Sequence, residues 1–537
     1  MDLDNRHYRI YFFAIVAAML LITAVSYLVR PLSPVNETLY TGIAWDMWNH
    51  HHLLVPLIDG HTYNQKPPLF FWLLELGWMV FGVNNWWPML LPALCSLGAA
   101  LLTATIAGKL FPRLATIRLS SALILTSMAY WIYYVPRARL DQLLTLCVVL
   151  SLYGLSKSLR QERYGFLLFG LGNGLGLLTK GPICFIFTLT PLILAPFFLK
   201  GKLSKQQWFI QASGSIIISI TIVAMWALPI IIQHPHYAKS ILWDQTAERL
   251  AHTHHVQIKV WYYYIIRLPL LIMPWLLWPT LWKGIQRVSL KKDPLFNWLC
   301  ISSLVIFCIL SFVIAQKGSR FLIPLMPLLA ILIAYYVSHA NYHCPTRFHH
   351  GVGIAFIILS ASILIFKPIV THYQLNLPAL TYYHGWWGLA PLTIGILWLR
   401  MTKLNRVNMT ALIAISSYCI TLLLYGIVQH MHTPNNNMQP IGTLIRHLQN
   451  QQHPIAFIGT YDDRFQFPGH IIQSITSLEN SQQIKHWIHQ HPNGYLIETL
   501  NIKDSKPTVD KPLYQQLYRH KQLIRVWKTQ AWLKTKM

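Results

Sequence analysis

Acidic residues are scarce in this chain of 537 residues. It holds 17 Asp and Glu against 43 Lys and Arg, and charged residues make up only 11% of the sequence while hydrophobic residues make up 54%. A water-soluble globular protein carries about a quarter charged residues. The scarcity of charge therefore excludes a soluble globule and predicts a polytopic, all-α membrane protein.

The sequence also lacks the features of several classes of soluble protein. The formal charge of +26 is not clustered on one soluble face, because Lys and Arg separate the apolar runs, so no nucleic-acid partner is expected. The seven cysteines lie in apolar runs or, for Cys344, in a short connection, and they form no CxxC motif. Neither a disulfide framework nor a cysteine metal site is predicted. The sequence has no long internal repeat and no low-complexity segment.

Long apolar runs recur through the first 430 residues. The run at residues 10–29 follows Arg6 and Arg9, is long enough to span a bilayer and lacks a convincing cleavage site. It predicts a retained first span with the N-terminus inside. Twelve further runs bring the predicted number of spans to thirteen: residues 88–108, 119–135, 141–159, 165–179, 182–199, 208–232, 262–282, 297–315, 320–339, 351–371, 385–400 and 409–428.

The apolar run at residues 69–83 is assigned by the positive-inside rule. If this run lies in the membrane interface, the basic clusters between later spans all fall on the cytoplasmic side. Residues 30–87 then form one long outer loop with interfacial helices, a depth that suits Trp72 and Trp78. After about residue 430 the composition becomes polar and the apolar stretches shrink to strand length. We therefore predict a transmembrane domain over residues 1–430 and a small periplasmic α/β domain over residues 431–537.

Most of the unusual charges fall on the predicted outer side, at the ends of apolar helices. Such residues are costly beside lipid unless they are paired or used, so a functional pocket is expected, although single Lys and Arg side chains also anchor interfaces. A hydroxyl acceptor needs a carboxylate to take its proton, and a leaving lipid phosphate needs cations. The charges in question are Glu37, Asp46, Lys66, Arg137, Arg139, Asp141, Lys180, Asp244, Glu248, Arg249, Lys317 and Arg320.

Several motifs in the same order resemble a known family. Over roughly residues 8–340 the chain is similar to the bacterial branch of the protein O-mannosyltransferase-like superfamily, which includes the enzyme that adds 4-amino-4-deoxy-L-arabinose to lipid A. The resemblance implies the GT-C fold and a polyprenyl-phosphate sugar donor. The motifs are Asn36-Glu37-Thr38-Leu39-Tyr40, Ala44-Trp45-Asp46-Met47-Trp48, Lys66-Pro67-Pro68-Leu69-Phe70, Arg139-Leu140-Asp141, Thr179-Lys180-Gly181-Pro182, residues 241–249 and Lys317-Gly318-Ser319-Arg320-Phe321.

The resemblance also implies roles for single residues. The family's first Asp is Asn36 here, and an amide cannot act as a general base, so the catalytic candidates are Asp141, Glu37 and Asn36, with Asp141 favoured. Asn36 is alternatively a helix N-cap. Lipid-phosphate binding is expected from Lys66, Arg137, Arg139, Lys180, Lys317 and Arg320. A family glutamate that helps to hold a metal is Gln65 here, so no metal or other cofactor is expected to be required.

Three further patterns favour structural roles. His252, His254 and His255 form an HxHH cluster, which among 25 scattered histidines we interpret as a solvated loop. The glycines around Gly174 lack the Gly-Lys-Ser/Thr of a phosphate-binding loop and indicate close helix packing. Pro67 and Pro68 are expected to start the interfacial helix.

The sequence thus predicts an integral-membrane glycosyltransferase of the bacterial inner membrane. It would move a sugar from a polyprenyl-phosphate donor to an envelope acceptor, lipid A or another glycolipid or glycan, on the periplasmic face. One alternative is a protein O-glycosyltransferase of the same fold. Another is a lipid-linked sugar transporter or flippase, although the charges lie at one end of the spans and no paired halves are seen. A scaffold or receptor would leave the outer basic residues unexplained.

Overall fold

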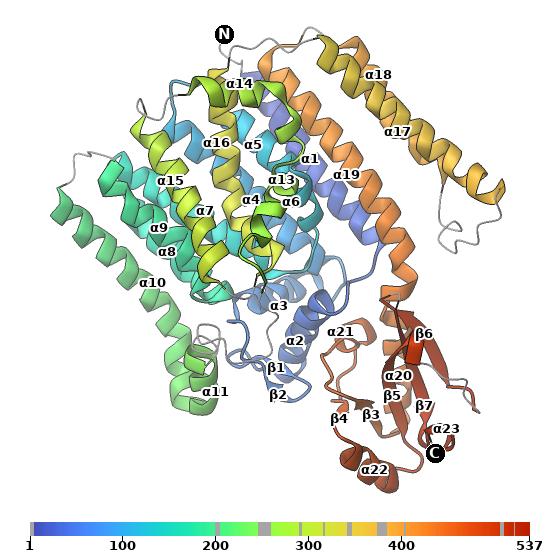
Figure 1. Ribbon diagram of the computed structural model, residues 1–537. Helices are drawn as coiled ribbons and strands as arrows, with labels where there is room; N and C mark the ends of the chain where they lie inside the picture. The colour runs from blue at the N-terminus through green and yellow to red at the C-terminus, as the bar shows by residue number, and fades with distance from the viewer. Residues whose placement is uncertain are drawn as a thin grey trace. The chain divides into compact units, whose positions relative to one another are not determined.

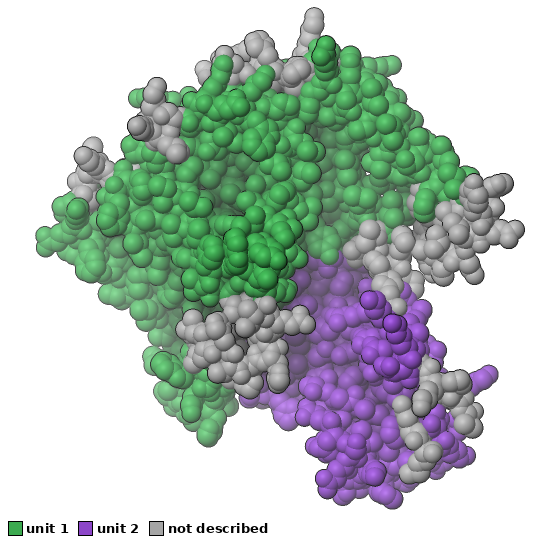
Figure 2. Space-filling view, in the orientation of Figure 1, with its two compact units in different colours: residues 1–26, 92–136, 140–427 green, residues 27–91, 137–139, 428–537 purple. Residues whose placement is uncertain are grey.

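The computed structural model is mostly helical through its first 430 residues, and its C-terminal segment contains a small β-sheet (Figure 1). It describes residues 5–198, 204–244, 259–288, 293–314, 317–340, 346–372, 384–401, 404–504, 510–519 and 521–536. The chain divides into two compact units, coloured in Figure 2. Unit 1 contains residues 1–26, 92–136 and 140–427, and unit 2 contains residues 27–91, 137–139 and 428–537.

Within the described residues, eight helical segments are long and apolar enough to cross a membrane. This confirms a polytopic helical membrane protein, whereas the predicted count of thirteen spans is not confirmed. The eight segments are Arg9–Val29, Trp87–Leu110, Leu140–Leu159, Lys205–Gln233, Pro294–Val313, Ser319–His339, Thr346–Phe366 and Arg406–Ile427. They belong to α1 (Asn5–Val29), α4 (Trp87–Leu110), α7 (Leu140–Leu159), α10 (Lys205–Gln233), α15 (Pro294–Cys308) with η3 (Ile309–Val313), η4 (Ser319–Leu325) with α16 (Met326–His339), α17 (Thr346–His372) and α19 (Arg406–Asn436).

Other predicted spans are shorter or broken in the structure. The predicted span at residues 119–135 is interrupted at Met128, and the one at residues 262–282 is interrupted at Met273 and Pro274. The two breaks meet, because the backbone nitrogen of Ala129 donates to the carbonyl of Met273 at 3.1 Å, which satisfies groups that a broken helix would leave unpaired. The remaining helical elements described in the first 430 residues, outside residues 30–86, are α5 (Ile117–Ser127), α6 (Ala129–Tyr134), α8 (Gly165–Lys180), α9 (Ile183–Phe198), α11 (Pro235–Lys239), η1 (Ser240–Asp244), α13 (Tyr263–Ile272), η2 (Trp275–Leu277), α14 (Pro279–Arg287), η6 (Gly385–Gly388) and α18 (Leu389–Arg400).

Glycines let α7 and α8 approach closely. A Cβ atom on Gly172 would lie 2.6 Å from the backbone nitrogen of Ser151, and one on Gly154 would lie 2.4 Å from the backbone nitrogen of Phe169. Such distances are too short for any side chain larger than hydrogen. The glycine-rich stretch is therefore a helix-packing surface, as predicted.

Residues of the predicted outer loop form the first part of unit 2. Its elements are α2 (Asn36–His50), the short strands β1 (Leu57–Ile58) and β2 (His61–Thr62), and α3 (Leu69–Phe81). Pro68 is the N-cap of α3, which confirms that the Pro67-Pro68 pair starts this helix. With 13 residues α3 is shorter than a membrane span requires.

The C-terminal part of unit 2 is a five-stranded mixed sheet with the strand order β4-β3-β5-β7-β6. β3 pairs in parallel with β4 and β5, and β7 pairs in antiparallel with β5 and β6. The predicted strands near residues 454–460 and 494–500 are β3 (Ile455–Ile458) and β5 (Tyr495–Asn501). The remaining elements are α20 (Gln439–Asn450), α21 (Gln466–Gly469), β4 (Thr476–Leu478), α22 (Ser481–Gln490), η7 (Ile502–Asp504), β6 (Tyr514–Tyr518), β7 (Gln522–Lys528) and α23 (Thr529–Lys536).

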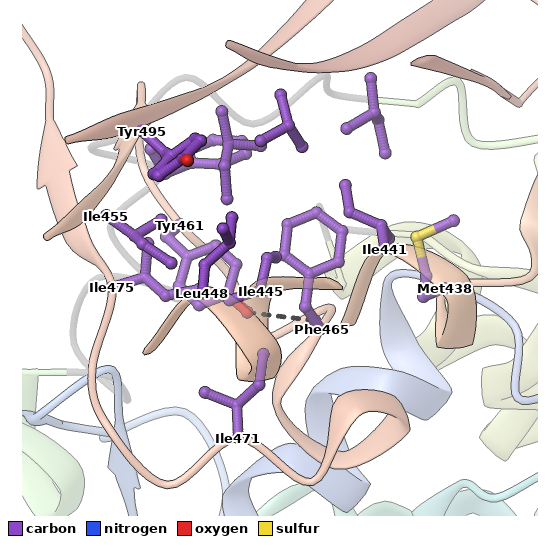
Figure 3. Packing of buried hydrophobic residues seen from close by; sticks show 14 of the residues in the cluster. Met438, Ile441, Ile445, Leu448, Ile455, Tyr461, Phe465, Ile471, Ile475 and Tyr495 are labelled. Carbon is purple, nitrogen blue, oxygen red and sulfur yellow. Dashed lines mark hydrogen bonds between the residues drawn. The ribbon is translucent and has the colours of Figure 1, made fainter. Parts of the chain in front are cut away.

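One apolar cluster joins this sheet to the helices beside it (Figure 3). Ile441 and Ile445 of α20 and Ile497 of β5 are fully buried in it. The hydroxyl of Tyr461 accepts a hydrogen bond from the backbone nitrogen of Phe465 at 3.0 Å, so this buried polar tip is satisfied. The C-terminal segment therefore has a core of its own.

The loop helices and the C-terminal segment contact each other within unit 2. The Trp45 indole nitrogen donates to the carbonyl of Ile471 at 2.7 Å, and the rings of Trp78 and Phe467 stack with centroids 5.0 Å apart. These contacts explain why residues 27–91 and 428–537 form one unit. The domain boundary near residue 430 stays a prediction.

Candidate active site

Lys180 is the centre of the polar cluster in unit 1. Its ammonium group donates to Oδ1 of Asp141 at 2.5 Å and lies 4.7 Å from the centre of the Phe321 ring. Both partners of the ion pair are buried, with 3% of Asp141 and 7% of Lys180 exposed. Three of the sequence motifs therefore converge on one cluster: the Arg139-Leu140-Asp141 motif, the Thr179-Lys180-Gly181-Pro182 motif and the Lys317–Phe321 motif.

The helix ends explain why this pair is oriented as it is. Asp141 lies in the first turn of α7, and Lys180 is the last residue of α8. A carboxylate is favoured at a helix N-terminus and an ammonium at a C-terminus. The close packing of α7 on α8 then brings the two ends together. A buried ion pair of this kind is costly to desolvate, so its retention at a helix end indicates a function.

Lys317 and Arg320 flank the same cluster in unit 1. The Lys317 ammonium donates to the carbonyl of Lys259 at 3.1 Å, and burial lowers the pKa of this lysine. The guanidinium of Arg320 lies 5.6 Å from the centre of the Phe321 ring. The hydroxyl of Tyr264 binds both the nitrogen and the carbonyl of Gly318, which holds the loop between the two cations.

Unit 2 contains a second cluster, centred on Glu37. This carboxylate is 1% exposed and forms ion pairs with Arg30 and Arg137, the latter at 3.6 Å between Nη1 and Oε1. It also accepts a hydrogen bond from the backbone nitrogen of Ser33 at 2.8 Å. Burial alone would raise the pKa of Glu37, but the charges of Arg30 and Arg137 and the bond from Ser33 outweigh it and hold the pKa below its usual value. Glu37 is thus held in its ionised form.

Arg30 was missed by the sequence interpretation. It is 4% exposed, and it lines a cavity of about 360 Å³ whose other polar side chains include Asn85, Asn437 and Gln439. A signal was present, because Arg30 ends the first apolar run on its predicted outer side and precedes Glu37 by seven residues. In the sequence interpretation it lay within the outer loop of residues 30–87 and had no assigned role.

The structure places the remaining loop candidates as follows. Asn36 is the first residue of α2, and Val35 is its N-cap, so the alternative role of Asn36 as an N-cap is not supported. Lys66 is partly buried and donates to the carbonyl of Gln65 at 2.9 Å. The backbone nitrogen of Arg139 donates to the carbonyl of Arg137 at 2.7 Å, which makes a tight turn before α7.

Metal binding has little support in the described part of the chain. No group of three or more His, Cys, Asp or Glu side chains there has an arrangement that could hold a metal ion. The position of the family's metal-holding glutamate is Gln65, whose side chain is exposed. The HxHH cluster at His252, His254 and His255 lies outside the described residues.

The predicted site residues thus form two described groups. Asp141, Lys180, Lys317 and Arg320 belong to unit 1, where the first two are in direct contact. Asn36, Glu37, Lys66, Arg137 and Arg139 belong to unit 2, where Glu37 and Arg137 are paired. Arg139 directly precedes Leu140, so the two groups meet in the sequence at the start of α7.

Comparisons with known proteins agree with the motif resemblance. The family model of the dolichyl-phosphate-mannose-protein mannosyltransferases matches residues 65–227. An undecaprenyl phosphate-alpha-4-amino-4-deoxy-L-arabinose arabinosyl transferase of Pseudomonas savastanoi is 27% identical over 57% of this chain and 57% of its own. The corresponding enzyme of Erwinia tasmaniensis is 28% identical over 61% of this chain and 56% of its own. The chain therefore matches a little over half the length of these relatives.

The structural comparison extends over nearly the whole molecule. ArnT from Cupriavidus metallidurans, solved with bound undecaprenyl phosphate, superposes with a TM-score of 0.69 over 96% of this chain and 97% of its own, at 16% identity. The same protein without ligand superposes with a TM-score of 0.70. This chain therefore has the GT-C fold of ArnT and is similar in sequence to the aminoarabinose transferases.

Proposed function

We propose that this protein is a glycosyltransferase of the bacterial inner membrane that takes its sugar from an undecaprenyl-phosphate or similar polyprenyl-phosphate donor. The observation that carries the proposal is the buried Lys180–Asp141 pair, where three motifs of the resemblance meet. The family match, the sequence similarity to the arabinosyl transferases and the fold of ArnT support it. Fold alone does not establish an activity, so the pair and the family motifs are both needed.

The proposed reaction joins the anomeric carbon of the sugar to an oxygen or nitrogen of the acceptor. The acceptor gives up a proton, the bond from the sugar carbon to the phosphate oxygen breaks, and the lipid phosphate leaves with the negative charge. Lys66, Arg137, Arg139, Lys180, Lys317 and Arg320 are proposed to hold that phosphate, since cations stabilise the charge that develops on it.

We propose Asp141 as the acid-base group. In the structure its charge is balanced by Lys180. A lipid phosphate that draws the ammonium of Lys180 to itself would remove a positive charge from beside Asp141 and make its carboxylate a stronger base for the acceptor proton. Binding of the donor and activation of the acceptor are then coupled through one lysine.

Glu37 is less suited to proton transfer, because two arginines keep its pKa low. We propose that it acts by positioning Arg30 and Arg137, and that Asn36 orients the acceptor without taking its proton. An acceptor that is already nucleophilic, such as an amine or a phosphate, needs less base and would tolerate the amide at this position.

The acceptor is proposed to be lipid A or another envelope glycolipid or glycan, reached from the periplasmic side, where we also propose that residues 431–537 lie. A protein acceptor is the second candidate, because the matched family model is that of protein mannosyltransferases. A flippase would require translocation without transfer.

Reconstitution of the full chain in liposomes with a radiolabelled polyprenyl-phosphate sugar tests the proposal. Label should move to lipid A or glycan, and mass spectrometry of a deletion strain should show loss of the same sugar from the envelope. Transfer to protein would select the second candidate. Translocation without transfer, or neither, would overturn the proposal.

A further inference from the structure

Unit 1 contains a cavity far from the Lys180–Asp141 pair, at the other end of its helices. This cavity has a volume of about 450 Å³, within the usual range for sites that hold small molecules. It is lined by the C-terminal ends of α4, α7 and α16, by the start of α15 and by residues 111–114. Asp141 is at the first turn of α7 and Leu159 is its last residue, so the helix separates the two places by about 30 Å.

The cavity is predominantly cationic. Lys109, Arg113 and Arg160 line it, whereas Asp293 is its only acidic lining residue among the described residues. Asp293 is already used, since its Oδ1 caps α15 through the nitrogens of Leu295 and Phe296, at 3.0 and 3.2 Å. Its Oδ2 accepts from the hydroxyl of Tyr335 at 2.9 Å. These bonds fix the carboxylate but do not remove its negative charge, so the lining keeps a net positive charge from three cations against one carboxylate.

The three cations differ in their pairing. The ammonium of Lys109 lies 2.5 and 2.6 Å from the two carboxylate oxygens of Glu162. Arg160 donates to the carbonyl of Lys109 at 2.7 Å, which fixes its position without neutralising its charge. In the described part of the chain neither Arg113 nor Arg160 forms an ion pair with a carboxylate. Arg160 still acts on Glu162 at longer range, since its charge helps to lower the pKa of that carboxyl group, so the two guanidinium charges are only partly compensated.

The rest of the lining is apolar apart from Tyr335 and His339, whose ring nitrogen Nδ1 lies 3.0 Å from the carbonyl of Tyr335. Phe111, Leu114, Leu159 and Leu295 contribute to it, and Phe111 packs against Tyr335 with ring centroids 4.7 Å apart. A free phosphate or a nucleotide gains little from such a wall. A molecule with a phosphate next to hydrocarbon can use both parts, because guanidinium groups bind phosphate oxygens and the leucines can cover the adjoining chain.

The depth of the cavity agrees with this chemistry. Both α4, with 24 residues, and α7, with 20, are about as long as the hydrocarbon core is thick. Their ends therefore lie at the level of lipid headgroups. Basic cavities between helices at this depth are suited to anionic lipid headgroups.

A simpler role for these cations is to stabilise helix C-termini. That role accounts for Lys109, in the last turn of α4, and for the bond from Arg160 to the carbonyl of Lys109. It does not account for Arg113, which follows the end of α4 by three residues and is exposed. It also does not account for a cavity bordered by the ends of four helices.

We propose that this cavity binds the phosphate of an anionic membrane phospholipid, with Arg113 and Arg160 on the phosphate and the apolar wall on the adjoining glycerol and acyl carbons. The site is separate from the proposed transfer chemistry and does not depend on it. The bound lipid links the ends of α4, α7, α15 and α16 and stabilises unit 1.

The test measures thermal unfolding of the purified full chain in detergent with increasing phosphatidylglycerol. Phosphatidylcholine serves as the zwitterionic lipid, and inorganic phosphate and glycerol phosphate serve as probes without acyl chains. Arg113→Gln is the main variant, because Arg113 is exposed and its loss should not affect folding. Arg113→Gln/Arg160→Gln removes both charges. The matched controls are Arg400→Gln and Arg347→Gln/Arg400→Gln, exposed arginines of α18 and α17 that do not line the cavity.

Phosphatidylglycerol should raise the unfolding temperature of the wild type and of both controls, and phosphatidylcholine should not. Arg113→Gln should weaken the apparent affinity by about tenfold, as expected for loss of one charge-assisted contact, with the unfolding temperature without lipid unchanged. The double variant should show no lipid effect. Equal weakening in the controls would overturn the proposal, because the effect would be one of surface charge. Equal protection by inorganic phosphate would also overturn it, because the site would then not be one for lipid.

Discussion

Lys180 and Asp141 form a buried ion pair between the last residue of α8 and the first turn of α7, with 2.5 Å between Nζ and Oδ1. Each of the two side chains has its partner on the other helix, so the position of the pair depends on both helices. Their contact depends on the close packing of two helices through glycines such as Gly172, whose Cβ would collide with the backbone of Ser151. The close packing of α7 against α8 along their length therefore determines how near Asp141 and Lys180 lie at the ends of these helices.

Loss of one member of this pair should affect both stability and transfer. Asp141→Asn leaves the Lys180 ammonium buried without its carboxylate, which should cost about 3 to 5 kcal/mol. It should also reduce transfer by about a hundredfold or more if Asp141 takes the acceptor proton. Thermal unfolding and label transfer, measured on the same preparation, check the two effects.

A double variant separates these two roles. Asp141→Asn/Lys180→Met removes both charges, so most of the lost stability should return. Transfer should stay lost, because neither a base nor a cation is restored. Recovery of transfer together with stability would show that the pair is structural only.

Lys66 should matter for turnover and little for folding. Its ammonium is partly buried and donates to the carbonyl of the neighbouring Gln65, a local hydrogen bond that Lys66→Met removes. Turnover should fall by about ten- to a thousandfold, the scale of losing one electrostatic stabiliser. Lys485→Met, an exposed lysine of α22, is the matched control and should be silent. Wild-type transfer by a folded Lys66→Met protein would exclude this lysine from phosphate binding.

The sequence predicted features that repeat along the chain. Apolar length located α1, α4, α7 and α10 within a few residues, and strand-length apolar stretches located β3 and β5. The motif resemblance also placed Asp141 and Lys180 among the candidate site residues, as a catalytic and a phosphate-binding residue, but it did not predict that the two are in contact. The lengths of the apolar helices and strands depend on runs of neighbouring residues, so they can be read directly from the sequence.

Contacts between distant segments could not be predicted in this way. The bond from Trp45 to the carbonyl of Ile471 joins residues 426 positions apart, and no local pattern indicates it. Arg30 was missed because a cation at a span end is commonly an interface anchor, and its pairing with Glu37 depends on the turn at residues 30–36. The break at Met128 was missed because no proline or glycine marks it: the residues on either side are Ser127 and Ala129.

Glu37 should stabilise the protein at neutral pH and lose this effect in acid. Its folded pKa is lower than its unfolded value, so the folded state binds fewer protons and stability falls as pH drops below about 4.5. Glu37→Gln should destabilise the protein by about 3 to 5 kcal/mol at pH 7, because Arg30 and Arg137 lose their shared carboxylate. The difference between the two proteins should shrink toward pH 3. A difference that is constant with pH would mean that the Glu37 charge does not contribute.

Glu75 of α3 should have the opposite pH dependence. It is 6% exposed, its Oε1 has no hydrogen-bond partner in the described part of the chain, and burial raises its pKa to about 7. The folded state therefore binds more protons than the unfolded state between pH 4.5 and 7, and its stability falls as pH rises through that range, by up to about 3 kcal/mol.

Glu75→Gln removes the ionisation, so it should raise the unfolding temperature at pH 8 and have little effect at pH 4.5. Glu479→Gln, at an exposed position, should change neither. An equal effect of Glu75→Gln at both pH values would show that shape or hydrogen bonding is responsible, because a cost of charge burial must disappear when the carboxyl group is protonated.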